Sequence, residues 1–172
     1  MTAETVPPGP AHGRIDPVMA VVAGLGAGVI ATVAQIAMWW LAGMPLPETL
    51  FRDARLAAAL VMGIEVLPPP STPQWNILLV ATLIHFLLSV LYALIAAHWV
   101  SRLGNGSVPF AGALYGLTLY VINLYGFTLL FPWFEVARDW VTLLTHLVFG
   151  VVLTAGYRLL ARDPHRPERP GV

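Results

Sequence analysis

Four long apolar stretches, separated by short polar segments, dominate the chain. They cover residues 18–41, 77–100, 108–131 and 140–161. The hydrocarbon core of a bilayer is about 30 Å thick and needs about 20 apolar residues in a helix, a length that each stretch reaches. Helices satisfy their own backbone hydrogen bonds in lipid, and the alternation expected of a membrane strand is absent. The pattern therefore predicts an all-α polytopic membrane protein with four transmembrane helices.

A fifth, shorter segment has the spacing of an amphipathic helix. Within and beside residues 51–62, the apolar positions recur at helical intervals: Leu50, Phe51, Ala54, Leu60 and Val61. Pro47 suits a first helical turn, and Gly63 ends the pattern. We expect a short amphipathic helix lying on the outer surface.

The second half of the chain repeats the first. The motif Ala23-Gly24-x3-Gly28-x6-Gln35 returns as Ala111-Gly112-x3-Gly116-x6-Asn123, and His85-x3-Ser89-Val90 returns as His146-x3-Gly150-Val151. Each copy holds two membrane helices, so both enter the bilayer in the same orientation and form a parallel repeat. The predicted domain covers residues 17–161, with repeat one at 18–100 and repeat two at 108–161. The Pro-rich segments 1–16 and 162–172 are expected to be disordered cytoplasmic tails.

Composition supports the membrane assignment and limits the chemistry. The chain is 58% hydrophobic and 10% charged, with zero net charge and no cysteine. Its mean hydropathy is +0.75. Disulfides and thiolate ligands are therefore excluded, and a nucleic-acid partner has no electrostatic support. All nine basic residues are arginines, which we interpret as the codon bias of a GC-rich bacterium.

Charge also predicts the orientation. With four spans both termini lie on one side, which carries six arginines: Arg14, Arg102, Arg158, Arg162, Arg166 and Arg169. The other side carries three arginines, outnumbered by five acidic residues: Glu48, Asp53, Glu65, Glu135 and Asp139. The positive-inside rule then predicts a multi-pass protein of the bacterial inner membrane with both termini in the cytoplasm.

Each predicted span carries one strongly polar residue at a similar depth. A rise of 1.5 Å per residue places Gln35, His85, Asn123 and His146 about 9–12 Å below the outer ends of their helices. Polar side chains in a membrane normally face the bundle interior, so we expect a buried polar layer. Three roles are open to this layer. Its side chains can hydrogen-bond across helices, they can bind a proton, ion or small polar ligand, or His85 and His146 can hold a haem or metal. No cofactor is predicted, because no buried carboxylate completes a metal site and the haem signal is weak.

Two further groups of residues recur in both copies. The GxxxG pairs Gly24/Gly28 and Gly112/Gly116 predict close helix packing, with either the other copy or a second protomer as partner. The outer segments contain Glu48 and Arg52 at i,i+4 and Glu135 and Arg138 at i,i+3, which predict ion pairs. With Asp53 and Asp139 these residues form an outer rim that can also collect cations or dock a partner.

No enzyme motif occurs: the chain has no GxSxG, Walker loop or HExxH. We therefore predict that it is not an enzyme.

Several short segments between about Leu78 and Leu159 resemble the YagU-like family of small bacterial inner-membrane proteins, namely Ile84-His85-Phe86-Leu87-Leu88-Ser89, Ala111-Gly112, Leu114-Tyr115-Gly116, Phe131-Pro132-Trp133-Phe134-Glu135 and Thr145-His146-Leu147-Val148. The resemblance implies a multi-span membrane protein of poorly defined activity. It also implies that His85, His146 and Pro132-Trp133 belong to a family pattern.

Three functions are compatible with these observations. The first is association, as an accessory subunit of a larger membrane complex or as a homo-oligomer. The second is a transport or proton-responsive module that uses the polar layer. The third is a redox anchor that holds haem between His85 and His146. Besides other membrane proteins, the lipid bilayer is the one partner that the sequence predicts.

Overall fold

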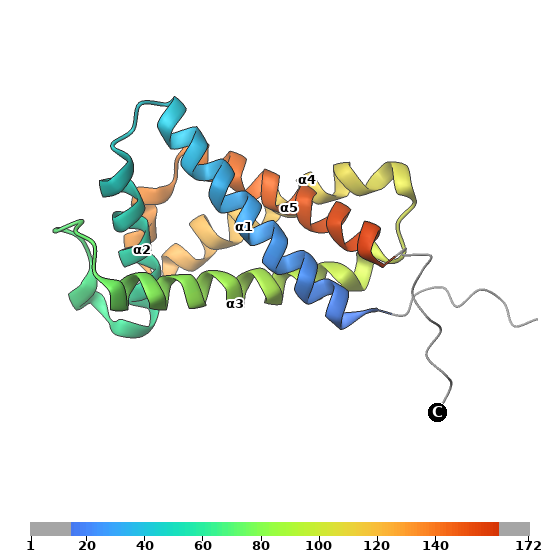
Figure 1. Ribbon diagram of the computed structural model, residues 1–172, viewed down its shortest axis with the longest axis horizontal. Coiled ribbons are helices and arrows are strands. Elements are labelled where there is room, and N and C mark those ends of the chain that lie inside the picture. The colour runs from blue at the N-terminus through green and yellow to red at the C-terminus, as the bar shows by residue number, and fades with distance from the viewer. Residues whose placement is uncertain (1–14, 162–172) are drawn as a thin grey trace, which may run out of the picture.

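The computed structural model describes residues 15–161, and none of them forms a β-strand. Four helical spans are long and apolar enough to cross a membrane: Pro17–Leu41 (α1), Trp75–Val100 (α3), Val108–Leu129 and Trp140–Leu160 (α5). The prediction of an all-α polytopic protein is confirmed. Figure 1 shows the shorter α2, Leu46–Met62, across one end of the bundle. The predicted tails lie outside the described residues, apart from Ile15 and Asp16, and the Asp16 side chain caps α1.

The third span is not a single α-helix. Its α-helical part, α4, covers Val108–Val121 and is followed by a π-helical turn, η3, at Ile122–Gly126 and a 3-10 turn, η4, at Phe127–Leu129. The π turn contains Asn123, and such bulges are common at functional sites. Three short 3-10 segments complete the chain: η1 (Ile64–Val66), η2 (Asn105–Ser107) and η5 (Pro132–Ala137).

Equivalent glycines make equivalent contacts in the two helical hairpins. A Cβ added at Gly24 of α1 would meet the Ser89 carbonyl oxygen and the Ala93 Cβ of α3 at 2.8 Å. In the second hairpin, a Cβ added at Gly112 of α4 would meet the Gly150 carbonyl oxygen and the Thr154 hydroxyl of α5. The GxxxG motifs therefore pack α1 on α3 and α4 on α5, inside each hairpin. Neither the other copy nor a second protomer is their partner.

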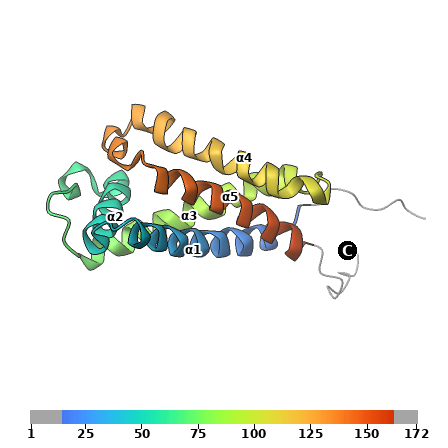
Figure 2. The same cartoon turned by 90° about the horizontal axis from the view of Figure 1, so that it is seen from above.

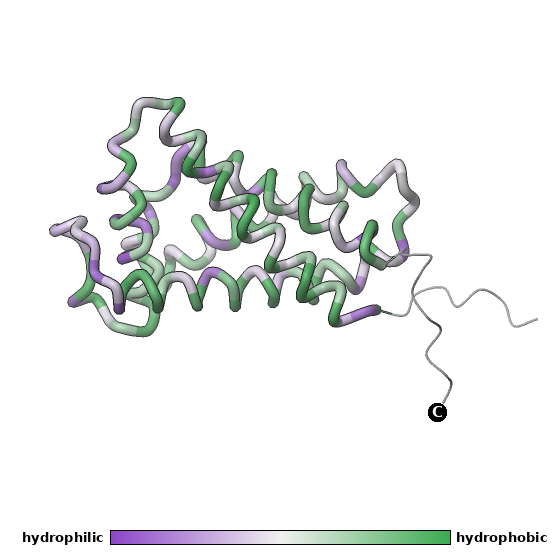
Figure 3. Tube along the Cα trace, viewed as in Figure 1, coloured by the Kyte–Doolittle hydropathy of each residue, from purple (hydrophilic) through white to green (hydrophobic). Residues whose placement is uncertain are grey.

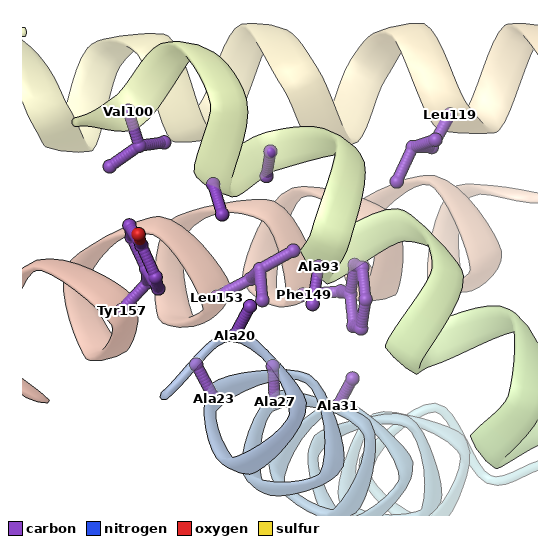
Figure 4. Packing of buried hydrophobic residues seen from close by; sticks show 12 residues of the cluster. Ala20, Ala23, Ala27, Ala31, Ala93, Val100, Leu119, Phe149, Leu153 and Tyr157 are labelled. Atoms are coloured by element: carbon purple, nitrogen blue, oxygen red, sulfur yellow. The ribbon is translucent and has the colours of Figure 1, made fainter. Parts of the chain in front are cut away.

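The half of the bundle far from α2 is filled by small side chains. Figure 4 shows Ala20, Ala23, Ala27 and Ala31 of α1 packed towards the larger side chains of α5. This lets α1 and α5 approach closely (Figure 2). Between α3 and α4, by contrast, tyrosine side chains make the contact, and the Tyr115 hydroxyl donates to the Tyr92 carbonyl at 2.8 Å. The wider spacing here leaves room for a cavity.

The predicted amphipathic helix is present as α2, but the face that it buries differs from the predicted one. Val61 is 71% exposed, whereas Leu56, Ala58 and Ala59 are buried. Arg55 is also buried, because its guanidinium donates to the Val66 carbonyl at 3.0 Å and to Thr72 at 3.2–3.3 Å. Figure 3 shows the hydrophilic residues gathered at this α2 end of the molecule, while the long helices are largely hydrophobic.

Candidate functional site

The four polar residues of the predicted layer line one cavity of about 160 Å³ between the spans. Gln35 comes from α1, His85 from α3, Asn123 from η3 and His146 from α5. All four side chains are partly buried, and none lies on the exposed outside of the bundle. The repeat therefore brings two amides and two imidazoles together, as the sequence predicts.

A complete hydrogen-bonded chain joins Asn123 and His146 of the second copy to Tyr92 of the first copy. The Tyr92 hydroxyl donates to Oδ1 of Asn123 at 2.6 Å, and Nδ2 of Asn123 lies 3.3 Å from Nε2 of His146. Nδ1 of His146 lies 2.8 Å from the carbonyl of Thr142, which can only accept, so Nδ1 carries the proton. Nε2 then accepts from Asn123, and every ring nitrogen of His146 is satisfied.

The first copy is incomplete at the equivalent positions. Nε2 of His85 lies 3.3 Å from the Gly28 carbonyl and 3.3 Å from the Thr32 hydroxyl, so Nε2 carries the proton here. Among residues 15–161, neither Nδ1 of His85 nor the amide of Gln35 has a hydrogen-bond partner. Both residues line the cavity, so they present unpaired polar atoms to it.

The two histidines are therefore in opposite tautomers although the repeat relates them. The two amides differ as well: the Tyr92 hydroxyl donates to Asn123, while no described residue bonds to Gln35. A longer Gln side chain in place of Asn also moves the amide further from its helix. Asn123 and His146 are therefore closed by hydrogen bonds, whereas Gln35 and Nδ1 of His85 have no partner among the described residues.

Asp53 reaches the polar layer from α2. A cavity of about 420 Å³ between α1, α2 and α3 and another of about 280 Å³ on the α4–α5 side of α2 are both bordered by Asp53, Gln35 and His85. Nε of Arg52 donates to Oδ1 of Asp53 at 2.8 Å. Burial raises the pKa of Asp53 above its ordinary value of 3.8; Arg52 opposes this shift, and the nearby Asp139 adds to it.

The outer rim differs from its prediction in one pair. Arg52 bonds to Asp53, its neighbour along α2, and not to Glu48, because its side chain turns towards the carboxylate at the cavity. Glu48 is exposed. The second predicted pair is present, with Arg138 2.8 Å from Glu135. Arg138 also donates to the Leu124 carbonyl at 2.6 Å and lies 4.5 Å from the centre of the Tyr125 ring. Asp139 caps α5 by accepting from the Thr142 amide at 2.8 Å.

The donor set does not fit a bis-histidine haem. Axial ligation needs a free lone pair on one nitrogen of each imidazole. At His146, Nδ1 is protonated and Nε2 faces the amide of Asn123. Within residues 15–161, no group of three or more His, Asp or Glu side chains comes together as a metal site.

Sequence reasoning missed three contributors to the site. No sequence pattern marks Tyr92, because its role depends on the spacing of α3 and α4. Thr142 lies on α5, one turn before His146, and its buried Oγ1 has no hydrogen-bond partner. Asp53 was predicted as a rim residue. Its place beside the layer follows from how α2 folds back over the bundle, which no local pattern encodes.

No protein-family model, curated protein or solved structure matches the chain.

Proposed function

We propose that this chain is a multi-pass protein of the bacterial inner membrane that binds a proton or a small polar ligand between its four spans. It would act as a transport or proton-responsive module and not as an enzyme. One observation carries the proposal: Gln35 and Nδ1 of His85 face a cavity without partners, while the equivalent Asn123 and His146 are fully bonded. Unpaired polar atoms inside a membrane bundle are costly, so a bound ligand or water that pairs them is favoured.

The proposed orientation has both termini in the cytoplasm. Arg102 and Arg158 lie at the end of the bundle that holds the start of α1 and the end of α5. Arg52, Arg55 and Arg138 lie at the α2 end, where they bond to acidic or carbonyl groups. At the α2 end five acidic residues outnumber these three arginines, whereas Arg102 and Arg158 share the other end with one described acidic residue, Asp16, and this balance favours that other end as the inner one.

The cavity would then open towards the outer side. The inner half of the bundle is filled by the alanine-rich core around Ala27, Ala93 and Ala97, all almost fully buried. The two larger cavities border α2 and lie at the other end. A proton or solute from outside would reach His85 before it met the packed inner half.

Association, as an accessory subunit or homo-oligomer, stays a second proposal. The GxxxG glycines pack within each hairpin, so they leave no small-residue surface for another protomer. Copurification from native membranes in mild detergent tests this proposal directly. The resemblance to the YagU-like family, with its poorly defined activity, is compatible with either function and is likewise a proposal.

Cysteine accessibility tests the proposed site, because the chain has no native cysteine. In proteoliposomes, Gln35→Cys and His85→Cys should react with a small, water-soluble thiol reagent. Leu87→Cys is the matched control: it lies on the same helix as His85 and is 69% exposed on the outside of the bundle. We expect it to face lipid and to stay unreacted. Protection of both cavity cysteines would contradict the proposal.

The proton response needs a separate readout. We expect the tryptophan fluorescence of the reconstituted protein to change with external pH, and His85→Leu to abolish the change. His98→Leu, on the exposed end of the same helix, is the control and should leave the response intact. A response that survives in His85→Leu would remove this histidine from the proposed function.

A further inference from the structure

The cavity of about 280 Å³, here the outer cavity, has a lining of unusual chemistry. Its walls are aromatic and aliphatic, and three phenylalanines contribute: Phe127, Phe131 and Phe134. Its floor is the polar layer. Asp53 is the one acidic residue in the lining, and no arginine lines it. The cavity therefore combines an apolar wall with a single negative charge.

The unpaired polar groups of the outer cavity, the Gln35 amide included, each offer at least one hydrogen-bond acceptor. Nδ1 of His85 carries a lone pair, and one oxygen of Asp53 remains free after Arg52 binds the other. Thr142 is 7% exposed, and its Oγ1 has no partner among the described residues. Hydrogen-bond donors on a ligand suit these acceptors, and a positive charge on it would be attracted to the Asp53 carboxylate.

We propose that the outer cavity binds a small organic ammonium ion, with Asp53 as its counter-charge and the phenylalanine rings as walls around its apolar part. This inference rests on the proposed function, since it names the ligand class of the same site. Aromatic faces attract ammonium groups, and the attraction strengthens when water is excluded. The volume lies just below the usual range for ligand pockets, which favours a compact amine over a lipid.

Arg52 competes with such a ligand for Asp53. Its Nε is bonded to the carboxylate, but its buried Nη2 has no partner among the described residues, so the pair is held through one bond only. Asp139, at the start of α5, adds a second negative charge nearby. The contribution of α1 to the lining, Gln35, is uncharged. The Asp53 carboxylate is therefore only partly neutralised by Arg52 and can attract a cation in the cavity.

Protons compete with the ammonium ion as well. The titratable side chains facing the cavity are Asp53 from α2, His85 from α3 and His146 from α5. Because burial raises the pKa of Asp53, its carboxylate is neutralised at a higher pH than an ordinary aspartate. Affinity for the cation should therefore fall as pH falls through this raised pKa, and a second proton on either imidazole would weaken binding further.

Calorimetric titration of the full-length protein in lipid nanodiscs tests the inference. The probe is 2-phenylethylammonium, and 2-phenylethanol is its neutral counterpart. We expect the ammonium to bind at least about tenfold more tightly than the alcohol, and Asp53→Asn to remove that preference. Arg52→Gln should tighten binding of the ammonium, because it frees the carboxylate. Glu48→Gln, a charge change on the exposed face of the same helix, should have no effect.

Equal binding of the two probes, or an unchanged ammonium affinity in Asp53→Asn with normal helix content, would overturn the inference. An unfolding curve that shows Asp53→Asn to be at least as stable as the unsubstituted protein guards against loss of fold in this variant. The proposed function is judged separately. If cysteines at positions 35 and 85 react and the proton response depends on His85 while no ammonium binds, the function stands and the ligand class is wrong.

Discussion

Substitution of Gly116 by alanine tests the close approach of α4 and α5 that holds the second hairpin together. A Cβ at this position would lie 2.8 Å from the carbonyl carbon of His146 and 3.0 Å from Cα of Leu147, with the His146 carbonyl oxygen nearer still. Both atoms belong to the backbone of α5, so neither can rotate away. The two helices have to separate by roughly half an ångström or more, and a gap of about 0.5–1 Å forfeits a quarter to a half of each van der Waals contact.

The expected loss follows from two opposing terms. Overpacking costs about 1–3 kcal/mol, and a backbone obstacle places Gly116→Ala at the upper end of that range. Alanine recovers about 0.5–1 kcal/mol over glycine within a helix. We therefore expect Gly116→Ala to lower the free energy of unfolding by about 1–2 kcal/mol. Because the obstacle is the carbonyl of His146, the variant should also disturb the bond between Asn123 and this imidazole.

Gly26→Ala is the matched control. It is exposed on α1, and a Cβ there would meet nothing within 4 Å. We expect it to leave stability unchanged or to raise it by up to about 1 kcal/mol. Denaturant unfolding in mixed micelles, followed by tryptophan fluorescence, measures both variants. Equal stability of the two would refute the close packing of α4 on α5.

Two further predictions concern the polar groups. Asp53→Asn should raise stability at neutral pH. In the folded protein the pKa of Asp53 is raised above 3.8, chiefly by burial. The stability linked to protonation of Asp53 is therefore present below pH 3.8 and is lost as the pH rises through the folded-state pKa. The advantage of the variant should therefore vanish near pH 4, and a constant or reversed difference across a pH series of unfolding curves would argue against burial as the dominant cause. Tyr92→Phe should cost about 1–2 kcal/mol, because Oδ1 of Asn123 loses its 2.6 Å donor; a cost near zero would remove Tyr92 from the network.

The membrane helices could be predicted because a long apolar segment can cross lipid only as a helix, which satisfies its own backbone hydrogen bonds. Predicted and observed spans agree within two residues at each end: for example, 77–100 against Trp75–Val100 and 140–161 against Trp140–Leu160. The repeat then fixes depth, since equivalent positions on parallel hairpins lie at one level. That is why Gln35, His85, Asn123 and His146 face a common cavity as expected.

The contacts that distinguish the two copies could not be predicted in the same way. Tyr92 stands where the second copy has Leu153, and its hydroxyl orders Asn123 only because α3 and α4 are held at the right distance. On α2, helical spacing alone favoured a face that includes Val61. The buried face instead includes Arg55, whose guanidinium donates to the Val66 and Thr72 carbonyls, and helical spacing does not encode such contacts between segments. The position of Asp53 beside the cavity, and not at the predicted rim, likewise depends on how α2 lies against the bundle.

The central claim is that one half of the polar layer is bonded and the other half is open. Nitrogen-15 spectra of histidine-labelled protein in lipid nanodiscs test it most directly, because they distinguish a protonated ring nitrogen from one with a lone pair. We predict that neutral His146 carries its proton on Nδ1 and neutral His85 on Nε2, and that 2-phenylethylammonium shifts only the Nδ1 signal of His85 strongly. Identical tautomers in the two residues, or equal shifts on addition of the probe, would contradict the account.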